Sequence, residues 1–132
     1  MWKGTGYCSM ADYTERDIDE LYRILDLCDR IEKITNRIGN ALQEFLSDAV
    51  YGDAVKMNLL QIGEVTNRLS DACKEKCPEA GWCKISGLRN IIVHSYEKVD
   101  DTLIWNIAVR DVPELKARIT ERLREWGEDE DM

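Results

Sequence analysis

The sequence predicts an all-α fold, a helical bundle of about four to six helices. Apolar residues recur at three- and four-residue steps over long stretches, and no segment shows the sustained alternation of a strand. The composition, 44% hydrophobic and 33% charged with two prolines and eight glycines, is typical of a helix-rich globular protein. We expect one domain over residues 14–126, between a flexible N-terminal tail (1–13) and an acidic C-terminal tail (127–132).

The N-terminal half predicts two long helices. The first follows a Thr14 cap and stops near Gly39, with apolar residues at helical spacing between them. Residues 40–48, "NALQEFLSD", predict a short connecting helix or turn, and Ser47 or Asp48 is placed to cap a second long helix over 49–74. The apolar stripe of that helix is Val55, Leu59, Ile62, Val65 and Leu69.

Gly63 interrupts the second long helix near its middle, directly before Glu64. A glycine in a helix interior costs about 1 kcal/mol relative to alanine, so we expect close helix packing at this position. Glu64 would then lie near a helix crossing.

The C-terminal half predicts three further helical segments. The stretch "EKCPEAGWCK" breaks the pattern with Pro78 and Gly81, while Trp82 is expected to anchor into the core. Helix resumes at about residue 86 and carries "RNIIVHSY". Asp100 or Asp101 is expected to cap a short helix through 107, and Asp111 with Pro113 to open the last helix, whose apolar face is Leu115, Ile119, Leu123 and Trp126.

The charge balance restricts the kinds of partner. The formal net charge is −8, half of it from the acidic residues 128–131, so a nucleic-acid site would have to be a local feature rather than a general basic surface. No apolar run approaches the ~18–20 residues of a membrane span, and the first ten residues lack a signal-peptide core. We expect a cytoplasmic protein with no membrane partner.

Two clusters allow both a functional and a structural interpretation. Arg16, Arg23, Arg30 and Arg37 repeat every seven residues and could face phosphates, but an aspartate precedes each of the first three by four residues, which favours a solvated face of helix salt bridges. Cys73, Cys77 and Cys83 could bind zinc together with His94, although their spacing matches no common zinc motif. The five cysteines otherwise suit reduced thiols better than disulfides.

His94, the only histidine, lies five residues after Arg89 and two before Tyr96. On a straight helix Arg89 and His94 would be about 140° apart around the axis, so convergence needs a helix that is distorted or ends near His94, or two copies that meet in a dimer. If they converge, His94 can transfer protons and Arg89 can hold a phosphate. This pair suits metal-free cleavage of RNA through the ribose 2′-hydroxyl, a group that DNA lacks. A structural histidine at the end of a helix is the alternative.

"GLRNIIVHSY" resembles the signature of the HepT-like branch of the HEPN superfamily, an arginine, four residues, a histidine, one residue and a tyrosine. The similarity extends in order through "DIDELYRILDLCDRIEKI", "LLQIGEVTNRLS", "PEAGWCKISGLRN" and "VDDTLIWNIAVRDVPELKARI", over about residues 17–123.

The resemblance implies a homodimeric HEPN-like bundle and a metal-independent endoribonuclease, the toxin of a bacterial toxin–antitoxin pair. Arg89 and His94 match the catalytic positions, Asn90 matches a polar residue that often follows the arginine, and Glu64 is expected to orient Arg89. Tyr96 matches the tyrosine to which a minimal nucleotidyltransferase antitoxin transfers AMP from ATP. No other cofactor is implied. The alternative is a non-catalytic helical scaffold or substrate of the nucleotidyltransferase.

Overall fold

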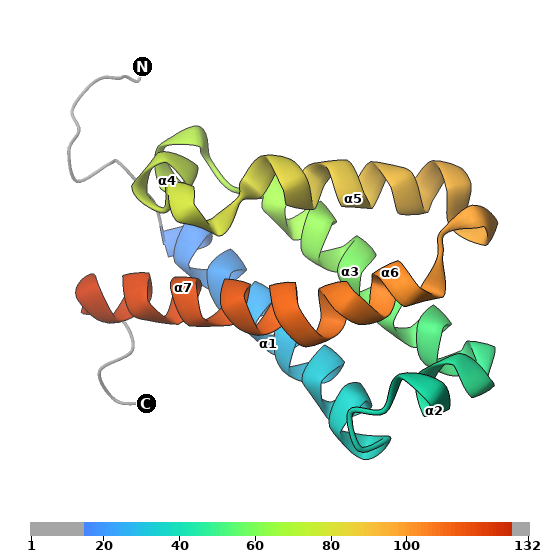
Figure 1. Cartoon of the computed structure of the whole chain (residues 1–132). Helices are drawn as coiled ribbons and strands as arrows, with labels where there is room; N and C mark the ends of the chain where they lie inside the picture. The colour runs from blue at the N-terminus through green and yellow to red at the C-terminus, as the bar shows by residue number, and fades with distance from the viewer. Residues whose placement is uncertain (1–14, 128–132) are drawn as a thin grey trace.

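The computed structural model describes residues 15–127 and consists of helices (Figure 1). The long helices are α1 (Glu15–Arg37), α3 (Ala49–Arg68), α5 (Trp82–Ser95) and α7 (Val112–Glu125). The short ones are α2 (Leu42–Ser47), α4 (Asp71–Lys76), α6 (Asp101–Asn106), the 3₁₀ turns η2 (Pro78–Ala80) and η3 (Tyr96–Lys98), and the π-helical turn η4 (Ile107–Asp111). No strand occurs within residues 15–127, so the predicted all-α bundle is confirmed. The predicted tails and the Thr14 cap lie outside the described residues, apart from Gly127.

The core forms where the apolar stripes of the long helices meet. α3 packs against both α1 and α5, and α1 also packs against α7. The predicted stripe of α3 is buried throughout, and so are Leu115, Ile119 and Leu123 of α7, while Trp126 is half-buried. Phe45 of α2 packs against Trp105 of α6, with ring centroids 5.1 Å apart.

The second long helix ends earlier than the sequence predicts. α3 stops at Arg68 instead of continuing to residue 74, and α4 follows as a separate helix. Asp17 of α1 accepts hydrogen bonds from the backbone N–H and the hydroxyl of Ser70, at 3.0 and 2.7 Å. Ser70 in turn caps α4 by accepting from the Cys73 N–H. A contact between residues 53 positions apart therefore decides this boundary.

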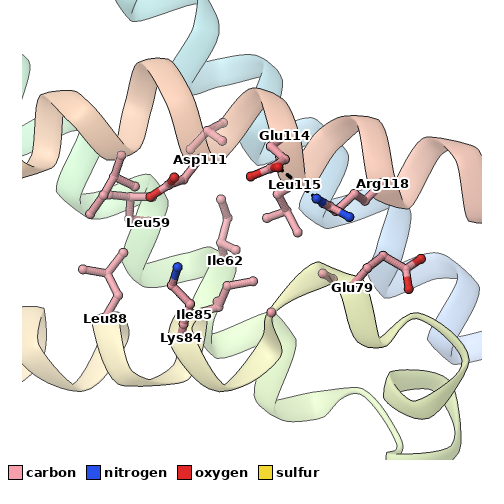
Figure 2. A pocket seen from close by; sticks show the side chains of 14 residues that line it. Leu59, Ile62, Glu79, Lys84, Ile85, Leu88, Asp111, Glu114, Leu115 and Arg118 are labelled. Atoms are coloured by element: carbon pink, nitrogen blue, oxygen red, sulfur yellow. Dashed lines mark hydrogen bonds and ion pairs between the residues drawn. The ribbon is translucent and has the colours of Figure 1, made fainter.

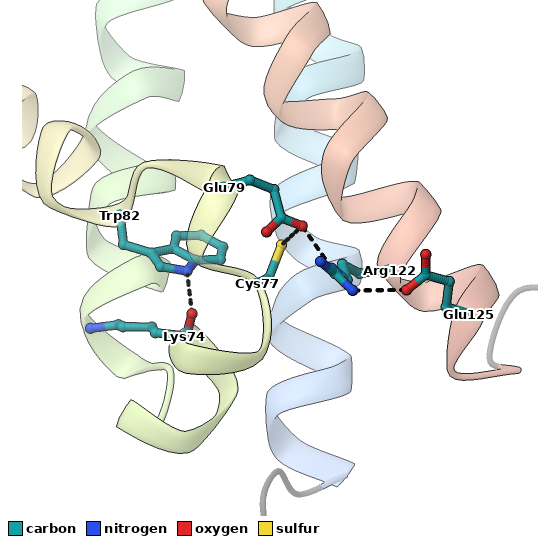
Figure 3. Close-up of polar contacts among 6 residues, drawn as sticks. All are labelled: Lys74, Cys77, Glu79, Trp82, Arg122 and Glu125. Carbon is teal, nitrogen blue, oxygen red and sulfur yellow. Dashed lines mark hydrogen bonds and ion pairs between the residues drawn. The ribbon is translucent and has the colours of Figure 1, made fainter.

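α5 begins at Trp82, four residues before the predicted start. Its entry is fixed by the polar contacts drawn in Figure 3: the Trp82 indole N–H donates to the Lys74 carbonyl at 3.2 Å, and Arg122 of α7 donates to Glu79 at 2.6 Å. Trp82 is buried, as predicted. These contacts hold the start of the helix that carries Arg89 and His94.

The chain from α6 to α7 is continuous helix rather than two capped helices. Asp100 caps α6 by accepting from the Thr102 N–H, which confirms one of the two expected caps, and Asp48 similarly caps α3. Asp111, in contrast, is helical and makes no side-chain capping bond, because η4 joins α6 directly to α7. The prediction that Asp111 opens a new helix was wrong.

The exposed faces of the helices carry charged pairs. Arg30 of the arginine stripe pairs with Asp26 at 3.2 Å on an exposed face, as the salt-bridge interpretation predicts. Among the described helices, none has the length and apolar character to cross a membrane.

Candidate functional site

Arg89 is held in place by side chains from two helices. Its Nη2 and Nε donate to Oε2 of Glu64 on α3, at 2.9 and 3.3 Å, and its Nη1 donates to Oδ1 of Asn90 at 2.9 Å. The contact expected between Glu64 and Arg89 is therefore present. A guanidinium has five N–H donors, so these three bonds fix its orientation and leave two for an anionic ligand.

Gly63 explains how α3 and α5 come close enough for this contact. A Cβ built on Gly63 would lie 2.3 Å from the Arg89 Cβ and 2.7 Å from its Cγ. The close packing predicted from the glycine is confirmed, and the residue that it admits is Arg89.

His94 does not meet Arg89 within one chain. α5 stays a regular α-helix through Ser95, so the two side chains lie about 140° apart around its axis. His94 is exposed, and within residues 15–127 it has no hydrogen-bond or ion-pair partner. α5 ends at Ser95, directly after His94, but Arg89 and His94 both lie inside its regular span, so neither distortion nor the end of the helix brings them together.

Tyr96 begins η3, directly after α5, and is 37% exposed. Its hydroxyl donates to Oδ1 of Asp53 on α3 at 3.0 Å, and the Lys56 ammonium lies 4.7 Å from its ring centroid. Partial burial, the bond to Asp53 and the charges of Asp53 and Asp101 together raise the pKa of Tyr96. The hydroxyl therefore stays protonated at neutral pH.

The neighbours of Tyr96 are the part of the site that the sequence did not indicate. Asp53 and Lys56 lie 43 and 40 positions earlier, on α3, and Asp101 lies on α6. Their helical spacing suggests only that Asp53 and Lys56 share one side of α3. Nothing in that spacing connects them to Tyr96.

A cavity of about 280 Å³ lies away from these residues, between α3, α5 and α7 (Figure 2). Its floor is apolar, with Leu59, Ile62 and Leu88, and Lys84 and Asp111 lie at its rim. Arg89, His94 and Tyr96 do not line it.

The cysteines do not assemble a metal site in the part of the chain that the structure describes. No three His, Cys, Asp or Glu side chains within residues 15–127 are grouped so that they could hold an ion. Cys73 and Cys77 are buried, whereas Cys83 is exposed at the start of α5. The alternative of a zinc site made of these three thiols and His94 is therefore not supported there.

The comparison with known proteins identifies a family over most of the chain. A family profile described as "Ribonuclease HepT-like" matches residues 24–122. The chain belongs to this HepT-like family. A "Putative RNase" of Methanocaldococcus jannaschii is 33% identical over 107 residues, which cover 80% of this chain and 96% of the relative. A "Probable ribonuclease HepT" of Thermococcus cleftensis is 31% identical over 106 residues, covering 80% and 94%.

A further relative of this HepT-like chain, also named "Putative RNase", comes from Caldanaerobacter subterraneus and is 30% identical over 105 residues. That match covers 79% of this chain and 91% of the relative. No solved structure matches the chain significantly. The family match extends from within α1 to near the end of α7 and includes every residue of the candidate site.

Proposed function

We propose that the chain is a metal-independent endoribonuclease in which Arg89 and His94 carry the chemistry. His94 takes the proton of a ribose 2′-hydroxyl as that oxygen attacks the adjacent phosphate, and in its protonated form it can give a proton to the leaving oxygen. Arg89 stabilises the charge that develops on the phosphoryl oxygens. The observation that carries this proposal is the fixed guanidinium of Arg89 on the helix that also presents the exposed His94.

The substrate in this proposal is RNA, because the nucleophile is the 2′-hydroxyl. The names of the relatives support the same class of activity. Glu64 positions Arg89 and does not touch the substrate, and Asn90 limits the rotation of the guanidinium from the other side. The net charge of −8 favours recognition of a restricted set of RNAs over general binding to polyanions.

We further infer that the active unit is a homodimer. With Arg89 and His94 on different sides of a regular helix, a complete site needs the histidine or the arginine of a second copy. Ile91 and Val93, which lie between Arg89 and His94 in the sequence, are 53% and 44% exposed, and Met57 of α3 is also exposed. Apolar side chains of this kind, next to an incomplete site, suit burial against another copy.

Tyr96 is the proposed point of control. A minimal nucleotidyltransferase antitoxin would transfer AMP from ATP to its exposed hydroxyl. The product carries an anionic nucleotide two residues from His94, where it obstructs RNA and repels its phosphates. This is the toxin–antitoxin arrangement expected from the family resemblance.

Expression without the nucleotidyltransferase tests the toxin. We expect growth arrest with the parent chain and none with His94→Ala. Tyr96→Phe should remain toxic when the nucleotidyltransferase is also expressed, because it offers no hydroxyl to modify. Equal arrest by the parent and His94→Ala would instead favour the scaffold alternative.

Mixing two inactive variants tests the dimer. If Arg89 and His94 act across the interface, each heterodimer of an Arg89→Ala chain and a His94→Ala chain contains one site with both functional residues. Partial recovery of RNA cleavage is therefore expected. No recovery despite heterodimer formation, checked by native mass spectrometry, would contradict a shared site.

A further inference from the structure

The hydroxyl of Tyr96 is coupled to a carboxylate of its own chain. It donates to Oδ1 of Asp53 at 3.0 Å, the distance at which a general base takes a proton. Both side chains are exposed, so a nucleotide held by another protein can reach the phenolic oxygen while this bond is present.

The face of the tyrosine ring lies against the buried ammonium of Lys56, which pairs with Asp101. Lys56 is only 6% exposed, and its ammonium lies 3.1 Å from Oδ1 of Asp101 on α6 and 4.7 Å from the centroid of the Tyr96 ring. Gly52 makes room for this pair, because a Cβ there would lie 3.0 Å from the Asp101 carboxylate. The titratable groups that face Tyr96 are therefore Asp53 and Lys56 from α3 and Asp101 from α6.

We propose that Asp53 is the general base for nucleotide transfer to Tyr96, so that the modified chain supplies a catalytic residue for its own modification. This inference rests on the proposed control of the chain by a nucleotidyltransferase. The phenolic oxygen attacks the α-phosphorus of a nucleoside triphosphate, the bond to the pyrophosphate oxygen breaks, and the phenolic proton passes to Asp53. Pyrophosphate leaves, and Asp53 then releases the proton to solvent.

A base is needed because phenolate is scarce at this position. The two carboxylates and partial burial raise the pKa of Tyr96, so very little of the hydroxyl is ionised at neutral pH. Transfer of the proton during attack avoids the formation of free phenolate. The Lys56 ammonium favours the same step, since its attraction to the ring grows as negative charge develops on the phenol.

The same geometry predicts what happens after transfer. The phenolic oxygen no longer carries a proton, so it cannot donate to Asp53, and the new phosphodiester places a negative charge beside that carboxylate. Like charges at this distance repel. The adenylated side chain therefore leaves Asp53 and projects into solvent near His94.

The test measures the initial rate of adenylation with the purified chain, a minimal nucleotidyltransferase of the proposed antitoxin type, ATP and Mg²⁺, with intact mass spectrometry as the readout. Asp53→Asn keeps an oxygen that can accept the hydroxyl proton in a hydrogen bond but removes the base. We expect its rate to fall about 100-fold at neutral pH. Its rate should then rise nearly tenfold per pH unit as phenolate forms, whereas the parent rate stays almost constant over about pH 6 to 8.

Asp48→Asn is the matched control on the same helix. Asp48 caps α3 and does not touch Tyr96, and asparagine is an equally good cap, so its adenylation rate should equal that of the parent. Unfolding curves of both variants verify that they fold.

The outcomes separate this inference from the proposed function. If the parent is modified at Tyr96 and Asp53→Asn is modified at the parent rate, Asp53 serves only as an anchor and the inference fails alone. A low rate for Asp53→Ala with a parent-like rate for Asp53→Asn leads to the same conclusion. If the parent is not modified, the proposed control by AMP transfer and this inference both fail.

Discussion

Gly63→Ala is expected to destabilise the chain, although alanine is the better helix former. The new Cβ would lie 2.3 Å from the Arg89 Cβ, so α5 must retreat by roughly 1 Å to reach normal contact. Overpacking of this kind costs about 1–3 kcal/mol, and the higher helix propensity of alanine returns about 1 kcal/mol. We expect the free energy of unfolding to fall by about 1 kcal/mol and the melting temperature by about 4 °C.

Gly87→Ala provides the matched control. Gly87 lies within α5, is exposed, and has open space where a Cβ would be added. The same substitution should therefore stabilise the chain by up to about 1 kcal/mol. Urea unfolding followed by circular dichroism measures both variants under identical conditions.

The effect on activity follows from the same contact. A displaced α5 loosens the bonds between Arg89 and Glu64, so Gly63→Ala should lower RNA cleavage at temperatures where the variant remains folded. A Gly63→Ala variant as stable as Gly87→Ala would contradict this prediction, because it would show that the two helices do not need this close approach.

Three further predictions concern ion pairs and thiols. Asp101→Asn should lower the free energy of unfolding by about 2 kcal/mol, because it leaves the buried Lys56 ammonium without its carboxylate partner. In urea unfolding, the double variant with Lys56→Met should regain most of that loss. The bond from Arg122 lowers the pKa of Glu79 to about 2, so the stability that this pair contributes is present above about pH 4.5 and is lost as the pH falls toward 2. Arg122→Gln should therefore lose less stability than the parent over that pH range. Equal losses in the two proteins would contradict the role of this pair. Alkylation of the folded chain should modify the exposed Cys83 and spare the buried thiols of Cys28, Cys73 and Cys77, because burial raises their pKa to about 11 or 12. Peptide mapping that found these three thiols modified as fully as Cys83 would contradict their burial.

Periodicity and caps were sufficient to predict the helices whose ends depend on local chemistry. The buried stripe of α3, the Asp48 and Asp100 caps and the role of Gly63 all follow from residues close together in the sequence. The wrongly predicted helix ends are those that tertiary contacts determine. Ser70 ends α3 through its bonds to Asp17, and η4 joins α6 to α7 across the expected Asp111 start.

The candidate site shows the same division. Arg89, Asn90, His94 and Tyr96 lie within eight residues, so a motif could indicate them together. Asp53, in contrast, approaches Tyr96 only because α3 and α5 are packed side by side. In the proposed dimer Arg89 meets His94 of a second copy, and the residue spacing within one chain could not predict that contact.

The proposed ribonuclease activity is tested by cleavage of labelled total tRNA and a long mRNA, with the purified, unmodified chain in excess EDTA and His94→Ala prepared identically. Mass spectrometry first verifies that Tyr96 carries no nucleotide. We predict that the parent cuts at least one of these RNAs and that His94→Ala does not. Absence of cleavage by an unmodified, folded parent, or equal cleavage by both proteins, would contradict it.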